Sequence, residues 1–338
     1  MYETRTKDGR TVVLPSRAGN LINSIAKEHN IAHGFDSDID ENKREHVRLG
    51  LLRMNGGDHD RTFKQLIDSK SYKTLAIFLS NLTTLNIWPS RLHSIYSDGE
   101  RPFHALVENR TITTLGLANH GEEQHMLDSL TRELRLDSKH ALALAGKDTL
   151  TSLDISHHTI ENVGFSALVG NRNMRSLYVR GNHINMREYT DLPPNDTLRT
   201  LDISRNHFYN PEILLATITG LTTLYISDSG VNTAGAIAIA ASKTLVYLDI
   251  SNNHLVRDDG AVALARSECI EGLDVSGTAI GEVGLIALAG NRKLKDLTMS
   301  RGRCEFTSMA AYRALVLNNT LERINGRPAR AGGLIYRQ

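Results

Sequence analysis

The feature that most constrains the fold is a leucine pattern that returns about every 24 residues between residues 150 and 300. Its clearest copies are LTSLDI at 150–155, LRTLDI at 198–203 and LVYLDI at 245–250. A repeat of this length cannot bury its apolar face alone, so neighbouring repeats have to stack. The pattern therefore predicts a solenoid that grows by addition of coils. The second leucine of each LxxLxL unit, here called the key leucine, recurs at intervals of 24, 24, 23, 24, 25 and 24 residues: Leu153, Leu177, Leu201, Leu224, Leu248, Leu273 and Leu297.

Each repeat divides into a strand, a turn and a short helix. Leu153 and Ile155 are two residues apart, so on a strand both side chains point to the same face. A small-residue run such as GAVALA at 260–265 then fits a short outer helix that packs closely on its neighbours. This is the leucine-rich-repeat pattern. It predicts an α/β leucine-rich-repeat solenoid, a horseshoe with a parallel concave sheet, short convex helices and a helical N-terminal cap.

Asparagine follows the key leucine by five residues in three repeats, at Asn182, Asn206 and Asn253. A side chain at this position can form hydrogen bonds to the backbone of the turn inside the solenoid. We therefore interpret these asparagines as structural residues.

Three regions follow from where the repeat begins and ends. Residues 1–81 lack it, and DIDENKREHVRLGLLRM at 38–54 has apolar residues near helical spacing, which predicts a helical N-terminal cap region. Residues 82–324 form the solenoid, with about ten repeats, and residues 325–338 form a C-terminal tail. Within the solenoid, residues 121–140 lengthen one interval and are interpreted as an insertion with a longer helix. An extra degenerate repeat around Leu134-Arg-Leu136 is the alternative.

The charge balance excludes some classes of partner. A net charge of +1, from 39 basic and 38 acidic residues, gives no global signature of nucleic-acid or membrane binding.

No apolar run has the length of a signal peptide or a transmembrane helix. Cys269 and Cys304 lie at different positions of the repeat, so free thiols in a reducing compartment are predicted. We expect a monomeric, cytoplasmic protein, although a bacterial injection signal would escape this test.

The combination of LDIS, Asn-His and Gly-Ala-x-Ala-Leu-Ala resembles the GALA-type leucine-rich-repeat effectors of plant-pathogenic and intracellular bacteria. More widely, it resembles the ribonuclease-inhibitor-like class. The matching stretches are GAIAIA at 235–240, GAVALA at 260–265 and GLIALA at 284–289, and the resemblance covers roughly residues 82–324. It implies a secreted effector that binds a host protein in the host cytoplasm after non-classical secretion.

GALA-type proteins also carry an F-box, a helical module that docks to a ubiquitin-ligase adaptor. Leu14-Pro15, followed by Leu21 and Ile22, is similar to an F-box start. The acidic residue usual after Leu-Pro is absent, because Ser16 and Arg17 stand there. A substrate-recognition or adaptor subunit of a ubiquitin ligase is therefore the alternative function.

Residues that flank the inward leucines of each strand should point to the concave face. They include aspartates, which repel one another until a cationic partner approaches, tyrosines of the kind that anchor interfaces, and a column of serines two residues further on. We predict a protein partner with a basic patch. The alternative is that aspartate after leucine is a recurrent feature of the repeat sequence and has no role in binding. The predicted binding residues are Asp154, Tyr178, Arg180, Asp202, Tyr225, Tyr247, Asp249 and Asp274.

Signatures of catalysis and metal binding are weak. His183, His207 and His254 share one position of the repeat, but no acidic or cysteine ligand shares it, so no metal site and no cofactor are predicted. The sequence contains no GxSxG elbow and no Walker or Rossmann glycine loop. It therefore predicts a binding protein and not an enzyme.

Overall fold

The computed structural model describes residues 2–5, 11–14, 79, 82–86, 101–118, 135–186, 192–208, 211–299 and 309–329. The chain divides into two compact units. The N-terminal unit is Met1–Leu134 and the C-terminal unit is Arg135–Gln338.

The described part of the N-terminal unit holds a hairpin and two coils. Strands β1 (Tyr2–Arg5) and β2 (Thr11–Leu14) pair antiparallel. Strands β3 (Thr84–Asn86) and β4 (Thr114–Gly116) pair in parallel, and helix α6 (Arg101–Glu108) lies between them in the sequence. Repeat structure is thus present where the pattern first appears.

The hairpin lies within residues 1–81, for which the sequence analysis predicts a helical cap region. Its second strand, TVVL, is rich in β-branched residues, so local preference favours a strand here. The helices predicted within 38–54 and 61–79 lie outside the described residues, apart from Leu79.

The C-terminal unit is a run of coils whose strands pair in sequence order. The strands are parallel, except that the last one turns back antiparallel to its neighbour. Key leucines lie opposite one another, as Leu201 does with Leu177 and Leu224, so the sequence repeat becomes structural register. The strands are β5 (Ser152–Asp154), β6 (Ser176–Tyr178), β7 (Thr200–Asp202), β8 (Thr223–Tyr225), β9 (Tyr247–Asp249), β10 (Gly272–Asp274), β11 (Asp296–Thr298), β12 (Arg323–Ile324) and β13 (Arg327–Pro328).

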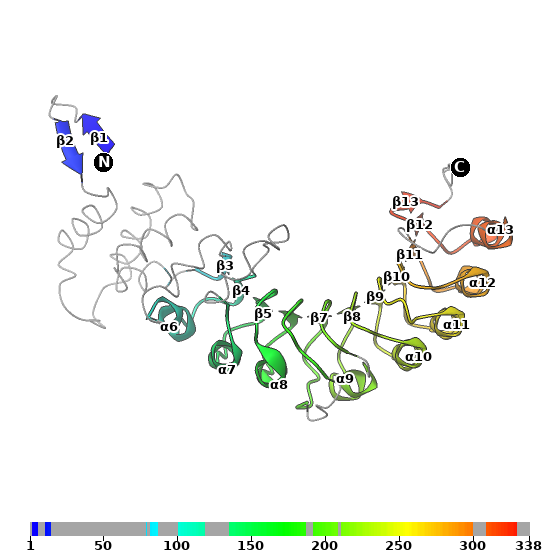
Figure 1. Cartoon of the computed structure of the whole chain (residues 1–338), viewed down its shortest axis with the longest axis horizontal. Helices are drawn as coiled ribbons and strands as arrows, with labels where there is room; N and C mark the ends of the chain where they lie inside the picture. Colours follow the sequence, from blue (N-terminus) through cyan, green and yellow to red (C-terminus); the bar gives the residue numbers. More distant parts are fainter. Residues whose placement is uncertain are drawn as a thin grey trace. The chain divides into compact units, whose positions relative to one another are not determined.

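Short helices cover the opposite side of this sheet, which Figure 1 shows as the outer side of the coils. This confirms the predicted leucine-rich-repeat solenoid with a parallel concave sheet and convex helices. The tail predicted at 325–338 begins with a turn and strand β13, and residues 330–338 lie outside the described part. The helices are α7 (Ser138–Ala145), α8 (Glu161–Gly170), α9 (Pro211–Thr217), α10 (Thr233–Ala240), α11 (Asp258–Ala265), α12 (Glu282–Gly290) and α13 (Met309–Leu317).

The core lies between the sheet and the helices. The predicted inward residues, among them Leu153, Ile155 and Leu201, are fully buried, which confirms the strand register. Helices α11 and α12 approach closely because Gly284 has no side chain. A Cβ there would lie 2.8 Å from the Cβ of Ala261, too close for a larger residue without a shift.

The asparagines predicted to be structural lie in the core and join consecutive coils. Asn206 is 2% exposed, and its Oδ1 accepts hydrogen bonds from the N–H groups of Asn182 (2.9 Å) and Ile184 (3.1 Å) in the preceding coil. Its Nδ2 donates to the carbonyl oxygens of Val179 and Ile203, both at 3.0 Å. One side chain therefore satisfies backbone groups on both sides of a coil boundary.

A second set of asparagines, which the sequence analysis did not single out, repeats this arrangement shortly before the next strand begins. Asn195 donates through Nδ2 to the carbonyl oxygen of Val169 at 2.6 Å. Its Oδ1 accepts from the N–H groups of Thr197 and Leu198, both at 2.8 Å. The other members with the same pattern in the C-terminal unit are Asn171, Asn291 and Asn318.

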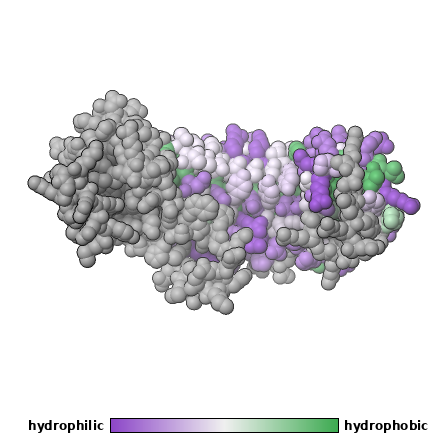
Figure 2. Space-filling model, turned by 90° about the horizontal axis from the view of Figure 1, so that it is seen from above, coloured by the Kyte–Doolittle hydropathy of each residue, from purple (hydrophilic) through white to green (hydrophobic). Residues whose placement is uncertain are grey.

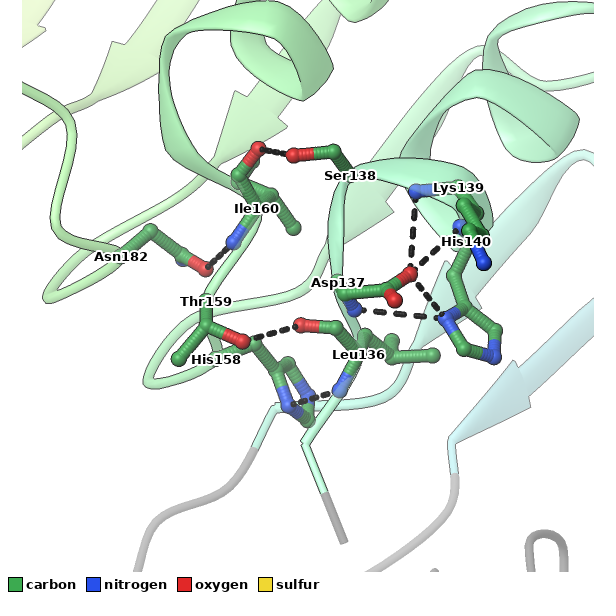
Figure 3. Close-up of polar contacts among 9 residues, drawn as sticks. All are labelled: Leu136, Asp137, Ser138, Lys139, His140, His158, Thr159, Ile160 and Asn182. Carbon is green, nitrogen blue, oxygen red and sulfur yellow. Dashed lines mark hydrogen bonds and ion pairs between the residues drawn. The ribbon is translucent and has the colours of Figure 1, made fainter. Parts of the chain in front are cut away.

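The first described coil of the C-terminal unit is joined to the next by polar side chains (Figure 3). Asp137 caps α7 by accepting from the N–H groups of Lys139 and His140. Ser138 donates to the carbonyl oxygen of Ile160 at 2.7 Å in the following coil. Residues 135–140, assigned to the 121–140 insertion from the sequence, are therefore part of a regular coil. Residues 121–134 lie outside the described part.

Candidate protein-binding face

Most of the predicted binding residues form one row across the concave sheet of the C-terminal unit. Each is the last residue of its strand and lies between a buried leucine and a buried isoleucine or valine, so its side chain points away from the core. We call them the Asp–Tyr row. The register places them side by side in this order: Asp154, Tyr178, Asp202, Tyr225, Asp249 and Asp274.

The other two predicted residues lie beside the row. Tyr247 begins strand β9, where it is opposite Thr223 and Gly272 of the neighbouring strands. Arg180 follows Tyr178 by two residues, just beyond the end of β6. In Figure 2, the visible surface of the described coils is mostly hydrophilic to neutral, in keeping with a row of aspartates and tyrosines.

The aspartates are half-buried, whereas full exposure would be expected of surface carboxylates. Neighbouring strands lie about 4.8 Å apart, so each side chain in the row is flanked on both sides by another. Burial raises the pKa of Asp202, and the charge of Asp154 adds to that rise. Hydrogen bonding by Ser204 and the positive charge of Arg180 oppose that rise.

Each aspartate also has a structural contact that sequence reasoning missed. Its Oδ1 accepts a hydrogen bond from the N–H group of the serine two residues later, at 2.9 Å for Asp202 with Ser204 and for Asp249 with Ser251. Such Asx turns end the strand. The serines are buried and do not form the exposed hydroxyl column expected from the sequence. The D-x-S spacing was the signal that could have revealed this. Asp154 and Asp274 make the same contact.

Two tyrosines form an aromatic pair at the centre of the face. The ring centroids of Tyr225 and Tyr247 are 5.4 Å apart, with an interplanar angle of 48°. Tyr247 lies against the neighbouring strand at Gly272, where an added Cβ would lie 2.7 Å from the tyrosine Cδ2. Burial and then the charge of Asp249 raise the pKa of Tyr247 to about 12. Its hydroxyl therefore stays protonated at neutral pH and can donate a hydrogen bond.

The negative charge on the face is compensated unevenly. Asp296, in the neighbouring row on β11, forms an ion pair with Arg323, whose Nη2 lies 2.8 Å from its Oδ2. Asp249 and Asp274 have no ion pair within the part of the chain that the structure describes. Burial raises the pKa of Asp274. Hydrogen bonding by Ser276 opposes this rise, whereas the negative charges of Asp249 and Asp296 add to it. A cation placed between these carboxylates would lower their energy.

The remaining candidate groups are not brought together. His183, His207 and His254 are exposed and lie beyond the ends of their strands. Among the described residues, no group of three or more His, Cys, Asp or Glu side chains is arranged to hold a metal ion. Cys269 is a half-buried free thiol whose Sγ lies 3.2 Å from the carbonyl oxygen of Lys243, and Cys304 lies outside the described part. No described helix combines the length and the apolar character needed to cross a membrane.

Comparison with known proteins identifies the same repeats. The Leucine Rich repeat family matches residues 148–169, 241–265 and 267–289. The protein BRASSINOSTEROID INSENSITIVE 1 of Arabidopsis thaliana is 28% identical over 166 residues, which are 46% of this chain and 12% of that protein. The crystal structure of the TLR13–ssRNA13 complex aligns with a TM-score of 0.48 and 17% identity, over 75% of this chain and 34% of the other. The chain thus contains leucine-rich repeats and spans a small part of this curated relative.

Proposed function

We propose that the C-terminal unit is a protein-binding scaffold whose concave face holds a partner with basic groups, and that the protein acts by binding and not by catalysis. The observation that carries this is the Asp–Tyr row, which places carboxylates and phenol rings side by side on a rigid parallel sheet. Tyrosine offers large contact area at low entropic cost, and charge complementarity selects the partner.

The finer proposal concerns where the binding takes place. The resemblance to GALA-type effectors supports a secreted bacterial effector that binds a host protein in the host cytoplasm. The small-residue stretches on which this resemblance rests lie in helices α10, α11 and α12, which begin at Thr233, Asp258 and Glu282. The ligase-adaptor alternative rests on Leu14-Pro15 and the residues that follow, of which the structure describes only Leu14, the last residue of strand β2.

The test compares which proteins are retained from plant-cell and animal-cell lysates by matched variants of the full chain. In the first variant, Tyr225→Ala and Tyr247→Ala remove both rings of the aromatic pair on the concave face. In the control, Ile237→Ala and Ile286→Ala remove two exposed side chains from helices α10 and α12 on the convex side.

A partner of the concave face is retained by the wild type and by the convex control, and it is lost with the tyrosine variant. A protein lacking residues 1–74 tests the alternative in the same assay. Recovery of a ubiquitin-ligase adaptor only when residues 1–74 are present would favour the adaptor function. Partners lost with the convex control and kept by the tyrosine variant would refute the proposal for the concave face.

A further inference from the structure

The centre of the Asp–Tyr row differs from both of its flanks. On one side the positive charge of Arg180 lowers the pKa of Asp202, against the effect of its burial, and on the other Arg323 forms an ion pair with Asp296. Between them, Asp249 and Asp274 stand directly opposite each other on β9 and β10. No cation of the described residues pairs with either of these two carboxylates. The face therefore has a local excess of negative charge at this point.

The two carboxylates are held in a fixed orientation. The Oδ1 of Asp249 accepts from the Ser251 N–H at 2.9 Å, and the Oδ1 of Asp274 accepts from the Ser276 N–H at 2.8 Å. The second oxygen of each carboxylate accepts no hydrogen bond from the described part of the chain. Neighbouring strands are separated by about 4.8 Å, a spacing that the N–H groups of one planar guanidinium can bridge.

An aromatic platform lies next to this pair. Tyr247 precedes Asp249 by two residues on the same strand, and its ring lies against Gly272, which precedes Asp274 by two residues. The absence of a side chain at 272 leaves the space that the ring occupies. A guanidinium stacks well on a tyrosine ring, whereas a lysine ammonium is a compact, strongly hydrated charge. The arrangement therefore favours arginine over lysine.

A buried hydroxyl beside the pair is incompletely satisfied. Ser276 is 9% exposed. Its hydroxyl lowers the pKa of Asp274, yet it reaches full hydrogen-bond geometry with no described group. A buried polar atom of this kind is costly unless a ligand or water supplies the missing contact. The Ser276 hydroxyl therefore acts on Asp274 from the buried side and helps to hold that carboxylate in place.

We propose that Tyr247, Asp249 and Asp274 form a subsite for one arginine side chain of the protein partner. The inference rests on the proposed function, in which the concave face is the binding surface. The guanidinium donates to the outward oxygens of both carboxylates while its plane lies on the Tyr247 ring, which is also in contact with the ring of Tyr225. The partner is thus a protein segment that presents an arginine.

The experiment uses the full chain and two short peptides of equal length, one alternating glycine with arginine and one alternating glycine with lysine. Their affinities are measured by isothermal titration calorimetry. The arginine peptide is expected to bind roughly threefold to tenfold tighter, because stacking and a second charge-assisted hydrogen bond add to the charge attraction.

Variants then test whether Tyr247, Asp249 and Asp274 cause the tighter binding of the arginine peptide. Asp249→Asn combined with Asp274→Asn keeps the Oδ1 acceptors of both Asx turns but removes the charges, so it should weaken the arginine peptide roughly tenfold and abolish its advantage. The control, Asp196→Asn combined with Asp259→Asn, makes the same charge change at exposed positions outside the row and should leave the preference intact. Tyr247→Ala should remove the arginine advantage, and Tyr247→Phe should retain it.

Equal affinity for the two peptides, an equal loss in the control variant, or no binding of either peptide would overturn the subsite. These outcomes are separable from failure of the proposed function. If partner capture is still lost with Tyr225→Ala and Tyr247→Ala, the concave face remains the binding surface although the arginine subsite is wrong. If capture is also unchanged, both proposals fail.

Discussion

The substitution Asn206→Ala tests how the coils are held together. In the wild type, Oδ1 of Asn206 accepts from the N–H groups of Asn182 and Ile184, and Nδ2 donates to the carbonyl oxygens of Val179, Ile203 and Ser204. Alanine removes all of these contacts at a position that is 2% exposed, where water has little access.

The magnitude follows from the groups left without a partner. Two buried N–H donors lose their acceptor, and each such loss costs about 1–3 kcal/mol, so the free energy of unfolding should fall by about 4 kcal/mol. The carbonyl oxygens that lose the Nδ2 donor add less to this loss of stability, because buried carbonyl oxygens tolerate a missing hydrogen bond better than buried N–H groups do. Asn206→Ser should lie in between, since Ser229 at the same position of the next coil donates its hydroxyl to the carbonyl oxygens of Ile203 and Ser227.

Urea unfolding monitored by circular dichroism measures the change in free energy. Asn173→Ala is the matched control, because Asn173 is exposed, and its unfolding free energy should change by less than about 0.5 kcal/mol. If Asn206→Ala and Asn173→Ala shifted the transition equally, the buried asparagines would not be what joins the coils, and the reasoning would be refuted.

Three further outcomes are expected. Leu201→Ala should reduce the free energy of unfolding by roughly 2–5 kcal/mol, because it leaves a cavity where a fully buried side chain was, and the same urea titration measures it. Burial raises the pKa of Asp274 in the folded protein above the usual value of 3.8, so its ionisation lowers stability as the pH rises above 3.8. Asp274→Asn should therefore melt higher than the wild type at pH 7, with the difference vanishing below pH 3.8; a higher melting temperature only at acid pH would contradict this. Partner binding should weaken with added salt, because the carboxylates are partly exposed before binding, and a salt-independent affinity would argue against a charged interface.

Much of the fold of the C-terminal unit could be predicted from the sequence, because the period of the key leucines fixes strand register. Leu153 and Leu201 are buried as expected, and Asn182 lies inside the solenoid. The second asparagine set carried its own signal, since Asn171 and Asn195 each follow a key leucine by 18 residues. Strand β2 carried one too, in the β-branched residues of TVVL.

The candidate site could be predicted only in outline. Alternation along each strand places aspartates and tyrosines on the concave face, but it does not reveal how far each is buried. The packing of Tyr247 against Gly272 depends on which strands are neighbours and which way the ring turns. The ion pair between Asp296 and Arg323 joins residues in separate coils, across a segment of irregular length. Such contacts follow from register and side-chain conformation together, and a single sequence supplies only the first.

The central claim, that the partner binds the concave face, is tested most directly by site-specific photo-crosslinking. A photoreactive phenylalanine analogue replaces Tyr225 on β8 in one protein and Ile237 on α10, in the following helix, in another. The account predicts that the partner is crosslinked from position 225 and not from position 237. Crosslinking from position 237 alone would place the partner on the helices and contradict the account.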